Sequence, residues 1–137
     1  MPRPKQCRKM CNPPKMQGFK PYGISCGELD SVTLLLEEYE TIRLLDYDGL
    51  TQEQAAERMN VSRPTLTRIY EKARQAIAKA FVEGKMVIIE GGSVQFESQW
   101  YRCKRCFKLI EGLENHTRCK NCQNYDTDEL TPLNTTE

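Results

Sequence analysis

The sequence predicts a mainly α-helical protein: a three-helix bundle that contains a helix-turn-helix, followed by a small β hairpin and a compact cysteine-rich module. Hydrophobic residues recur at helical spacing through the centre of the chain, capping residues separate these segments, and two closely spaced cysteine pairs follow. The 137 residues divide into a basic proline-rich arm (1–27), a helix-turn-helix domain (28–84), a β hairpin or connector (85–98), the cysteine-rich module (99–125) and an acidic tail expected to be disordered (126–137).

The arm shows neither a helical nor a strand period, and it holds five of the seven prolines. Such a segment is either a flexible basic arm or a loop laid over the next domain. In the second case, we expect Phe19, Tyr22 and Ile24 to anchor it.

Three helices follow the arm. The first is expected from Ser31, since Leu35, Tyr39, Ile42 and Leu45 recur at spacings of three and four. In the second, Thr51 and Gln54 form a capping-box pattern; this helix runs to about Met59 and buries Ala55 and Ala56.

The third helix begins after a sharp turn and is long. Asn60 tolerates the left-handed conformation that such a turn needs, Ser62 is the expected N-cap, and Gly84 ends the helix. At about 100° per residue, one face of this helix is apolar and the opposite face is basic. The predicted core stripe is Leu66, Ile69, Ala73, Ile77, Ala80 and Phe81, and the basic ridge is Arg68, Lys72, Gln75 and Lys79.

Beyond Gly84 the period shortens to that of strands. Residues 85–90 and 94–96 flank Gly91, Gly92 and Ser93, and this arrangement predicts a β hairpin.

The charges are strongly segregated, although the net charge is only +1. Residues 1–27 carry a net charge of +6, residues 28–57 carry −8, residues 58–85 carry +5, and the remainder carries −2. Two basic blocks separated by an acidic one predict a polyanion-binding face built from the first and third segments.

The central pattern is typical of a unit that reads double-stranded DNA. The two alanines allow a close helix crossing, Asn60 allows the turn, and Val61 is an apolar plug. Because the major groove is only ~12 Å wide, the leading end of the third helix should carry short polar and basic side chains. We expect Arg68 to contact a base, Arg63 and Thr67 to contact bases or phosphates, and the remaining contacts to come from Pro64, Thr65, Lys72, Lys79, Thr51 and Gln52.

A resemblance to a known family is carried by MPRPK, FKPYGI (Phe19–Ile24), LEEYETIRLLDYDGLTQEQAAERMNVSRPTLTRIYEKAR (Leu36–Arg74) and EGKMVIIEGG (Glu83–Gly92). Together they resemble an uncharacterised prokaryotic family of predicted DNA-binding proteins with a helix-turn-helix similar to region four of sigma factors. The resemblance implies a regulatory protein whose last helix docks in DNA through Arg63, Pro64, Thr67 and Arg68. Many sigma-like units have an acidic residue where this chain has Pro64, so the resemblance implies no sequence preference. The chain has no sign of the promoter-melting regions of a complete sigma factor.

The cysteine-rich module has the spacing C-x₂-C-x₁₂-C-x₂-C, formed by Cys103, Cys106, Cys119 and Cys122. Two such pairs complete a tetrahedral thiolate site, and a segment this short needs a metal to fold. The spacing predicts a zinc ribbon with Zn²⁺ as its cofactor. Iron, as in rubredoxin-like carriers, is the less favoured alternative, and His116 is interpreted as a bystander.

Three more cysteines, Cys7, Cys11 and Cys26, lie in the arm. With no evident fourth ligand they make a weak metal motif. An iron–sulfur cluster or a redox trigger is the alternative to reduced, unligated thiols, the interpretation that we favour.

The composition favours a cytoplasmic protein without a membrane segment. Hydrophobic residues make up 39% and charged residues 28%, and no apolar run approaches the ~20 residues that span a bilayer. The basic start is not followed by the apolar segment of a secretory signal.

The function predicted from the sequence is sequence-specific binding of double-stranded DNA in transcriptional regulation. The alternatives are an adaptor that contacts RNA polymerase or another protein through the ribbon, and a rubredoxin-like electron carrier. No enzymatic activity is expected, since the chain has one histidine and no phosphate-binding loop. A homodimer is a further expectation, through the hairpin edge or the first helix.

The cysteine spacing yields a first testable prediction. We expect Cys119→Ser to release the metal and to unfold residues 99–125 while the helical content persists, because the metal supplies much of the folding energy of the module alone. Metal analysis and circular dichroism of the full chain measure the two effects. A collapse of the whole fold would show instead that the ribbon is integral to the helical domain.

Overall fold

The computed structural model describes residues 8–25, 27, 29–96, 98–103, 109–111 and 130–133. In these residues the protein is mixed α/β, with helices and three small sheets, so the prediction of a mainly α fold understates the strands. The elements are β1 (Arg8–Met10), β2 (Gly18–Phe19), β3 (Ser31–Leu34), α1 (Leu36–Ile42), the π-helical turn η2 (Arg43–Tyr47), α2 (Gln52–Met59), α3 (Arg63–Glu83), β4 (Met86–Ile89), β5 (Val94–Phe96), β6 (Trp100–Cys103), β7 (Leu109–Glu111) and β8 (Leu130–Pro132).

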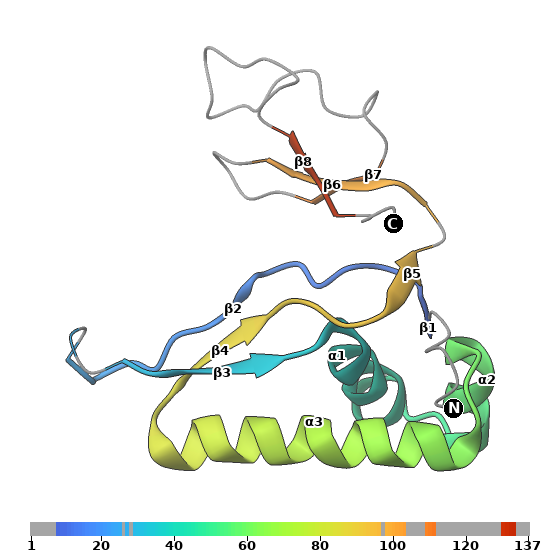
Figure 1. Ribbon diagram of the computed structural model, residues 1–137, viewed down its shortest axis with the longest axis horizontal. Helices are drawn as coiled ribbons and strands as arrows, with labels where there is room; N and C mark the ends of the chain where they lie inside the picture. Colours follow the sequence, from blue (N-terminus) through green and yellow to red (C-terminus); the bar gives the residue numbers. More distant parts are fainter. Residues whose placement is uncertain are drawn as a thin grey trace, which may run out of the picture.

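The strands pair across long distances in the sequence (Figure 1). β4 is the centre of a sheet with the order β2-β4-β3, antiparallel to β2 and parallel to β3, and β5 pairs in parallel with β1. The predicted hairpin of residues 85–98 is therefore wrong, because β4 and β5 each pair with strands from the first third of the chain. Gly18 permits the close approach of β2 to β4, since a Cβ there would meet the Val87 carbonyl oxygen.

The arm is structured where it is described, and its anchors differ from those predicted. Met10, Pro13 and Pro14 are buried, whereas Phe19 is 63% exposed and Tyr22 is fully exposed. Met10 of β1 and the two prolines that follow it, rather than the aromatic residues of the loop, hold the arm on the domain.

The first helix begins later than expected. Ser31–Leu34 form β3, and α1 starts at Leu36, because β-branched Val32 and Thr33 pair with β4 instead of entering a helix. In η2, the Asp48 N–H donates to the Arg43 carbonyl at 2.8 Å, a wider turn than that of an α-helix. The wider turn changes the helical register, and Leu44 is fully buried while Leu45 is only half-buried.

The second and third helices match their prediction closely. Thr51 and Gln54 cap α2 reciprocally, Asn60 has φ 57° in the left-handed region, and α3 ends at Gly84 with φ 67°. The Ser62 hydroxyl accepts the Thr65 N–H at 3.3 Å.

Two clusters form the core around α3. Leu66 packs with Ala55, Ala56, Met59 and Leu44 at the leading end of the helix, and Val61 covers this cluster as predicted. Farther along α3, Ala73 packs with Leu34 of β3 and Ile89 of β4. In Figure 1, α3 extends along the whole domain, with α2 at its leading end and the β2-β4-β3 sheet over its trailing half.

Two residues of the predicted α3 core stripe lie on the surface. Leu66, Ile69, Ala73 and Ala80 are buried, but Ile77 is 37% exposed and Phe81 is 86% exposed. The described residues that pack on α3 cover a band of its surface narrower than the ~100° of a typical apolar helix face. Ile77 and Phe81 therefore stay exposed at the edge of this band.

A buried cation of β6 joins the C-terminal strands to the arm. β6 pairs antiparallel with β7 and β8, and the Arg102 guanidinium donates to the Pro14 carbonyl at 2.9 Å and the Lys15 carbonyl at 3.2 Å. Burial lowers the pKa of Arg102.

Within the described ranges, no helix has the length and apolar character needed to cross a lipid bilayer.

The α2–α3 contact yields a stability prediction. Leu66 is fully buried, so Leu66→Ala should lower the free energy of unfolding by about 2–5 kcal/mol through lost burial and the cavity left behind. Chemical denaturation measures this loss. Val82→Ala is the matched control on the same helix; Val82 is 81% exposed, and its change should stay within ~0.5 kcal/mol. Equal losses for the two variants would contradict the core assignment.

Candidate nucleic-acid interface

All nine residues predicted to contact DNA lie in the described part of the chain. The leading end of α3 carries Arg63, Pro64, Thr65, Thr67 and Arg68; the start of α2 carries Thr51 and Gln52; and Lys72 and Lys79 follow along α3. The arginines, the lysines, Pro64 and Thr51 are exposed, whereas Gln52, Thr65 and Thr67 are half-buried. These residues therefore form one surface across the two helices.

The half-buried members of this surface connect the two helices. The Thr67 hydroxyl lies 3.1 Å from Gln52 Oε1 and equally far from the Arg63 carbonyl oxygen. A hydroxyl has one proton to donate, so these two acceptors compete for it. Thr67 and Gln52 thus set the position of the α2 N-terminus against α3, a role that the sequence pattern did not indicate.

Arg63 has an acidic neighbour at the surface. Its Nη1 lies 3.4 Å from Glu53 Oε1, and both side chains are more than half exposed. Exposed pairs of this kind contribute little to stability. The guanidinium is therefore available to a stronger anion at small cost.

The basic ridge predicted on α3 is present on its exposed side. Arg68, Lys72, Gln75 and Lys79 are all exposed. At 1.5 Å per residue, Lys79 lies about 16 Å along the helix from Arg68. Since the major groove is ~12 Å wide, a helix that places Arg68 at base edges leaves Lys79 at the level of the flanking backbone.

A polar contact next to this surface ties α3 to the end of η2. The Tyr70 hydroxyl donates to Asp46, 2.9 Å from Oδ1 and 3.0 Å from Oδ2, and the Arg74 guanidinium lies 5.4 Å from the Tyr70 ring centre. The hydrogen bond to Asp46 raises the pKa of Tyr70. A raised pKa means that this contact stabilises the fold below the ordinary tyrosine pKa of ~10 and is lost as the phenol ionises at higher pH.

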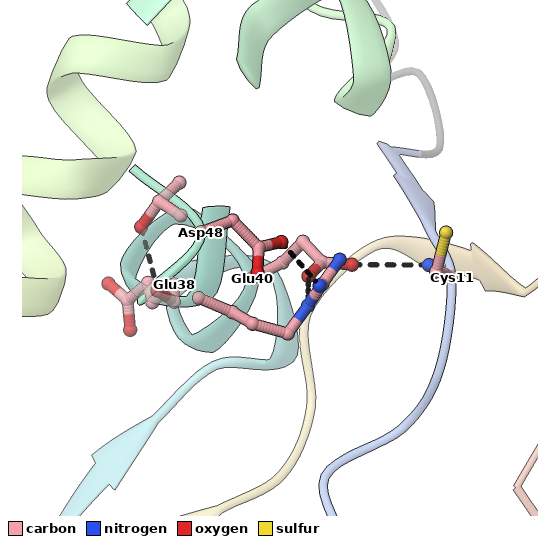
Figure 2. A network of polar contacts seen from close by, with 6 residues as sticks. Cys11, Glu38, Glu40 and Asp48 are labelled. Atoms are coloured by element: carbon pink, nitrogen blue, oxygen red, sulfur yellow. Dashed lines mark hydrogen bonds and ion pairs between the residues drawn. The ribbon is translucent and has the colours of Figure 1, made fainter. Parts of the chain in front are cut away.

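The acidic segment of α1 holds the arm (Figure 2). The Cys11 N–H donates to Glu40 Oε2 at 3.1 Å, Arg43 donates to Glu40, and Arg43 Nη1 lies 2.9 Å from Asp48 Oδ2. Burial alone would lower the pKa of Arg43, but its hydrogen bond to Glu40 and the charges of Glu40 and Asp48 raise it. Glu40 is 1% exposed, so it is a structural acid.

The same helix neutralises part of the arm's positive charge. Arg8 Nε lies 3.1 Å from Glu37 Oε2, and both side chains are largely buried. The distance is that of an ion pair, although the contact does not have hydrogen-bond geometry. Arg8 thus pairs with the acidic segment that separates the first and third segments, and the polyanion-binding face expected from those two segments stays a prediction.

The predicted metal ligands lie mostly outside the described residues. Cys103 is buried at the end of β6, whereas Cys106, Cys119, Cys122 and the bystander His116 are not described. Among the residues that are described, no group of three or more His, Cys, Asp or Glu side chains could hold a metal ion. Of the arm cysteines, Cys11 is exposed, and Cys7 and Cys26 lie outside the described ranges.

Comparison with known proteins places the chain in a family. Residues 1–97 match the family described as "Protein of unknown function DUF134". The chain belongs to this family. A "UPF0251 protein" of Chloroherpeton thalassium is 41% identical over 132 residues, which are 95% of this chain and 87% of that protein. "UPF0251 protein Teth39_0655" of Thermoanaerobacter pseudethanolicus is 50% identical over 112 residues, 82% of this chain and 95% of that protein. No solved structure matches the chain significantly.

The extent of the DUF134 match separates the two candidate sites. It includes α1, α2, α3 and the strands β1–β5, and it ends before β6. A "UPF0251 protein Teth514_1147" of Thermoanaerobacter sp. is aligned over 99% of its length while it covers 82% of this chain, so it is a shorter protein. The surface on α2 and α3 thus lies within the DUF134 region, and the cysteine-rich module lies beyond it.

Proposed function

We propose that this DUF134 protein binds double-stranded DNA sequence-specifically through a helix-turn-helix formed by α2 and α3, and that it acts in transcriptional regulation. The observation that carries the proposal is the leading end of α3. Arg63, Pro64 and Arg68 are exposed there, while Leu66 between them is fully buried against α2. Because Leu66 fixes this end of the helix, its polar and basic side chains are held in a defined position at the surface.

The geometry of the α2–α3 connection supports this proposal. A helix-turn-helix requires small residues at the crossing, and Ala55 and Ala56 are 0% and 4% exposed. It also requires a sharp turn, which Asn60 makes in the left-handed conformation. Thr51 and Ser62 cap the starts of α2 and α3, which supports an orientation of α3 that is set before any ligand binds.

The proposed contacts divide into base reading and backbone positioning. Arg68 is exposed, forms no ion pair with an acid in the described part of the chain, and lies in the second turn of α3, where its guanidinium can donate two bonds to guanine O6 and N7. Arg63 exchanges Glu53 for a phosphate or a base. Lys72 and Lys79 contact phosphates, and Thr51 and Gln52 at the α2 N-terminus contact another.

The cysteine-rich module is proposed to be a zinc ribbon held by Cys103, Cys106, Cys119 and Cys122. The support is the C-x₂-C-x₁₂-C-x₂-C spacing and the position of Cys103, which ends strand β6 of an antiparallel sheet. Thiolates of this number favour Zn²⁺ in a closed structural site. The module then serves as an attachment to the DNA-binding domain, with Arg102 connecting it to the arm.

The base-reading role of Arg68 is testable. Arg68→Ala should weaken binding to a preferred duplex by about 1–3 kcal/mol and relax the sequence preference, because a bidentate contact to one base pair is lost. Fluorescence anisotropy with the preferred duplex and with a scrambled duplex measures both effects.

Arg58→Ala is the matched control for Arg68→Ala. Arg58 is an exposed arginine of α2 that borders a small cavity with Cys11 and Glu40 beside the arm. The control removes the same charge from the same domain and should leave the preference unchanged. If Arg68→Ala lowers the affinity for the preferred and the scrambled duplex equally, Arg68 contacts only phosphate.

A further inference from the structure

The trailing half of α3 exposes large apolar side chains on a helix that is otherwise well packed. Phe81 is 86% exposed and Ile77 is 37% exposed, although Ala73 and Ala80 between and beside them are buried. Exposed aromatic residues in such a position mark interaction sites.

These side chains belong to a continuous row, which we call the distal stripe: Tyr70, Arg74, Ile77 and Phe81. Their spacings of four, three and four residues keep them on one line along the helix. Arg74 lies over the Tyr70 ring, so the row is partly ordered already. Tyrosine, arginine and phenylalanine are the residues enriched at the centres of protein interfaces.

We propose that the distal stripe is the homodimer interface, where α3 of a second copy packs antiparallel to α3. This inference rests on the proposed DNA-binding function and names the partner that completes it. Around a two-fold axis between residues 77 and 81, Ile77 of each copy meets Phe81 of the other. The interface predicted from the sequence was a hairpin edge or the first helix, and the hairpin is not formed.

The charges along α3 complement an antiparallel partner. α3 has no basic residue in its last turn, and the cation at the negative end of its dipole is Lys85 just beyond the helix, whose Nζ lies 3.5 Å from Glu83 Oε1. In the proposed register, Arg74 of one copy lies beside the end of the partner helix at Gly84. Ile24, 39% exposed, continues the apolar surface at this point, since a Cβ on Gly84 would lie 2.6 Å from its Cδ1.

The proposed dimer also gives the correct spacing for DNA between the leading ends of the two α3 helices, which we call the reading ends. The midpoint between Ile77 and Phe81 lies 13 residues beyond Leu66, which is about 20 Å along the helix. Two such arms separate the reading ends by about 40 Å when antiparallel, and by about 36 Å at the ~50° crossing common for packed helices. Half-sites one turn of DNA apart are ~34–36 Å from each other.

The direction of the stripe fits this arrangement as well. At 100° per residue, the stripe lies about a quarter turn around α3 from the face of Pro64, Thr67 and Arg68. A two-fold axis perpendicular to both helices therefore directs the two reading faces to the same side. A stripe opposite the reading face would have directed them away from each other.

The size of the stripe predicts a weak dimer in solution. From Tyr70 to Phe81 it is about 16 Å long, so the contact falls in the small, transient class of protein interfaces. Binding of both reading ends to one duplex supplies the remaining stability of the dimer, because the second contact is then intramolecular.

A charge-exchange experiment tests the interface in the full chain without DNA. One variant carries Ile77→Lys and Phe81→Lys, and the other carries Ile77→Glu and Phe81→Glu. Sedimentation equilibrium up to ~100 µM should show wild-type dimers and monomers for each variant alone, because like charges then meet across the two-fold axis. The equimolar mixture should show more dimer than either variant alone and less than wild type, since exposed ion pairs are weak. Circular dichroism of each variant confirms that it is folded.

Val82→Glu is the matched control. Val82 is 81% exposed at the same end of α3 but lies about 100° from Phe81 around the helix, so its substitution should change the dimer dissociation constant by less than about threefold. A wild-type monomer at ~100 µM, or folded variants that remain as dimeric as wild type, would overturn the proposed interface.

Binding to duplexes with one half-site, or with two inverted half-sites one turn apart, separates this inference from the proposed function. Tighter binding to the paired sites by wild type than by the lysine variant supports the dimer. Specific binding to single half-sites, with no gain on the paired sites for wild type over the lysine variant, would overturn the dimer and retain the DNA-binding function. A dimer that selects no duplex sequence would retain the interface and overturn that function.

Discussion

The buried crossing of α2 and α3 determines the direction in which the leading end of α3 points. Ala55 and Ala56 are small enough for close approach, and Leu66 fills the space between the helices. Asn60 makes the turn without glycine, at φ 57°, a conformation in which an asparagine is strained less than most residues. Any larger side chain at the crossing would tilt α3 and move the α3 side chains of the proposed DNA surface with it.

The acidic segment has a different physical role from the one that its charge suggests. Its glutamates at positions 37, 38 and 40 are all buried, and each is used inside the domain. Glu37 pairs with Arg8, Glu38 accepts the Leu35 N–H at the start of α1, and Glu40 binds both Cys11 and Arg43. Glu37 and Glu40 thereby hold the basic arm on α1, while Lys9, Lys15 and Lys20 of the arm and the ridge on α3 stay exposed.

The predictable parts of this fold are those encoded by local chemistry. The sequence predicted the N-caps of α2 and α3, the turn between them and the end of α3. The residues responsible, Thr51, Ser62, Asn60 and Gly84, interact only with neighbours a few positions away. The strands of the arm were missed because β1 and β2 are only three and two residues long and pair with strands more than sixty positions away. Such short segments have no readable period of their own.

The candidate site follows the same division. The positions of Arg63, Arg68 and the lysines on the surface could be predicted from helical spacing, while the Thr67–Gln52 bridge could not, since it joins residues 15 positions apart. The exposure of Ile77 and Phe81 was also beyond prediction, because a helical period shows that a stripe is apolar but not what covers it. Ile77 and Phe81 were assigned to the core, and their exposure is the observation from which we infer contact with a second copy of the chain.

Selection from a randomised duplex pool at two salt concentrations tests the central claim most directly. The DNA-binding account predicts enrichment of a motif, with an affinity that falls as salt rises because phosphate contacts release counterions. A motif with two-fold symmetry would also report two copies on one site. Weak, salt-sensitive binding without any enriched sequence would contradict the account.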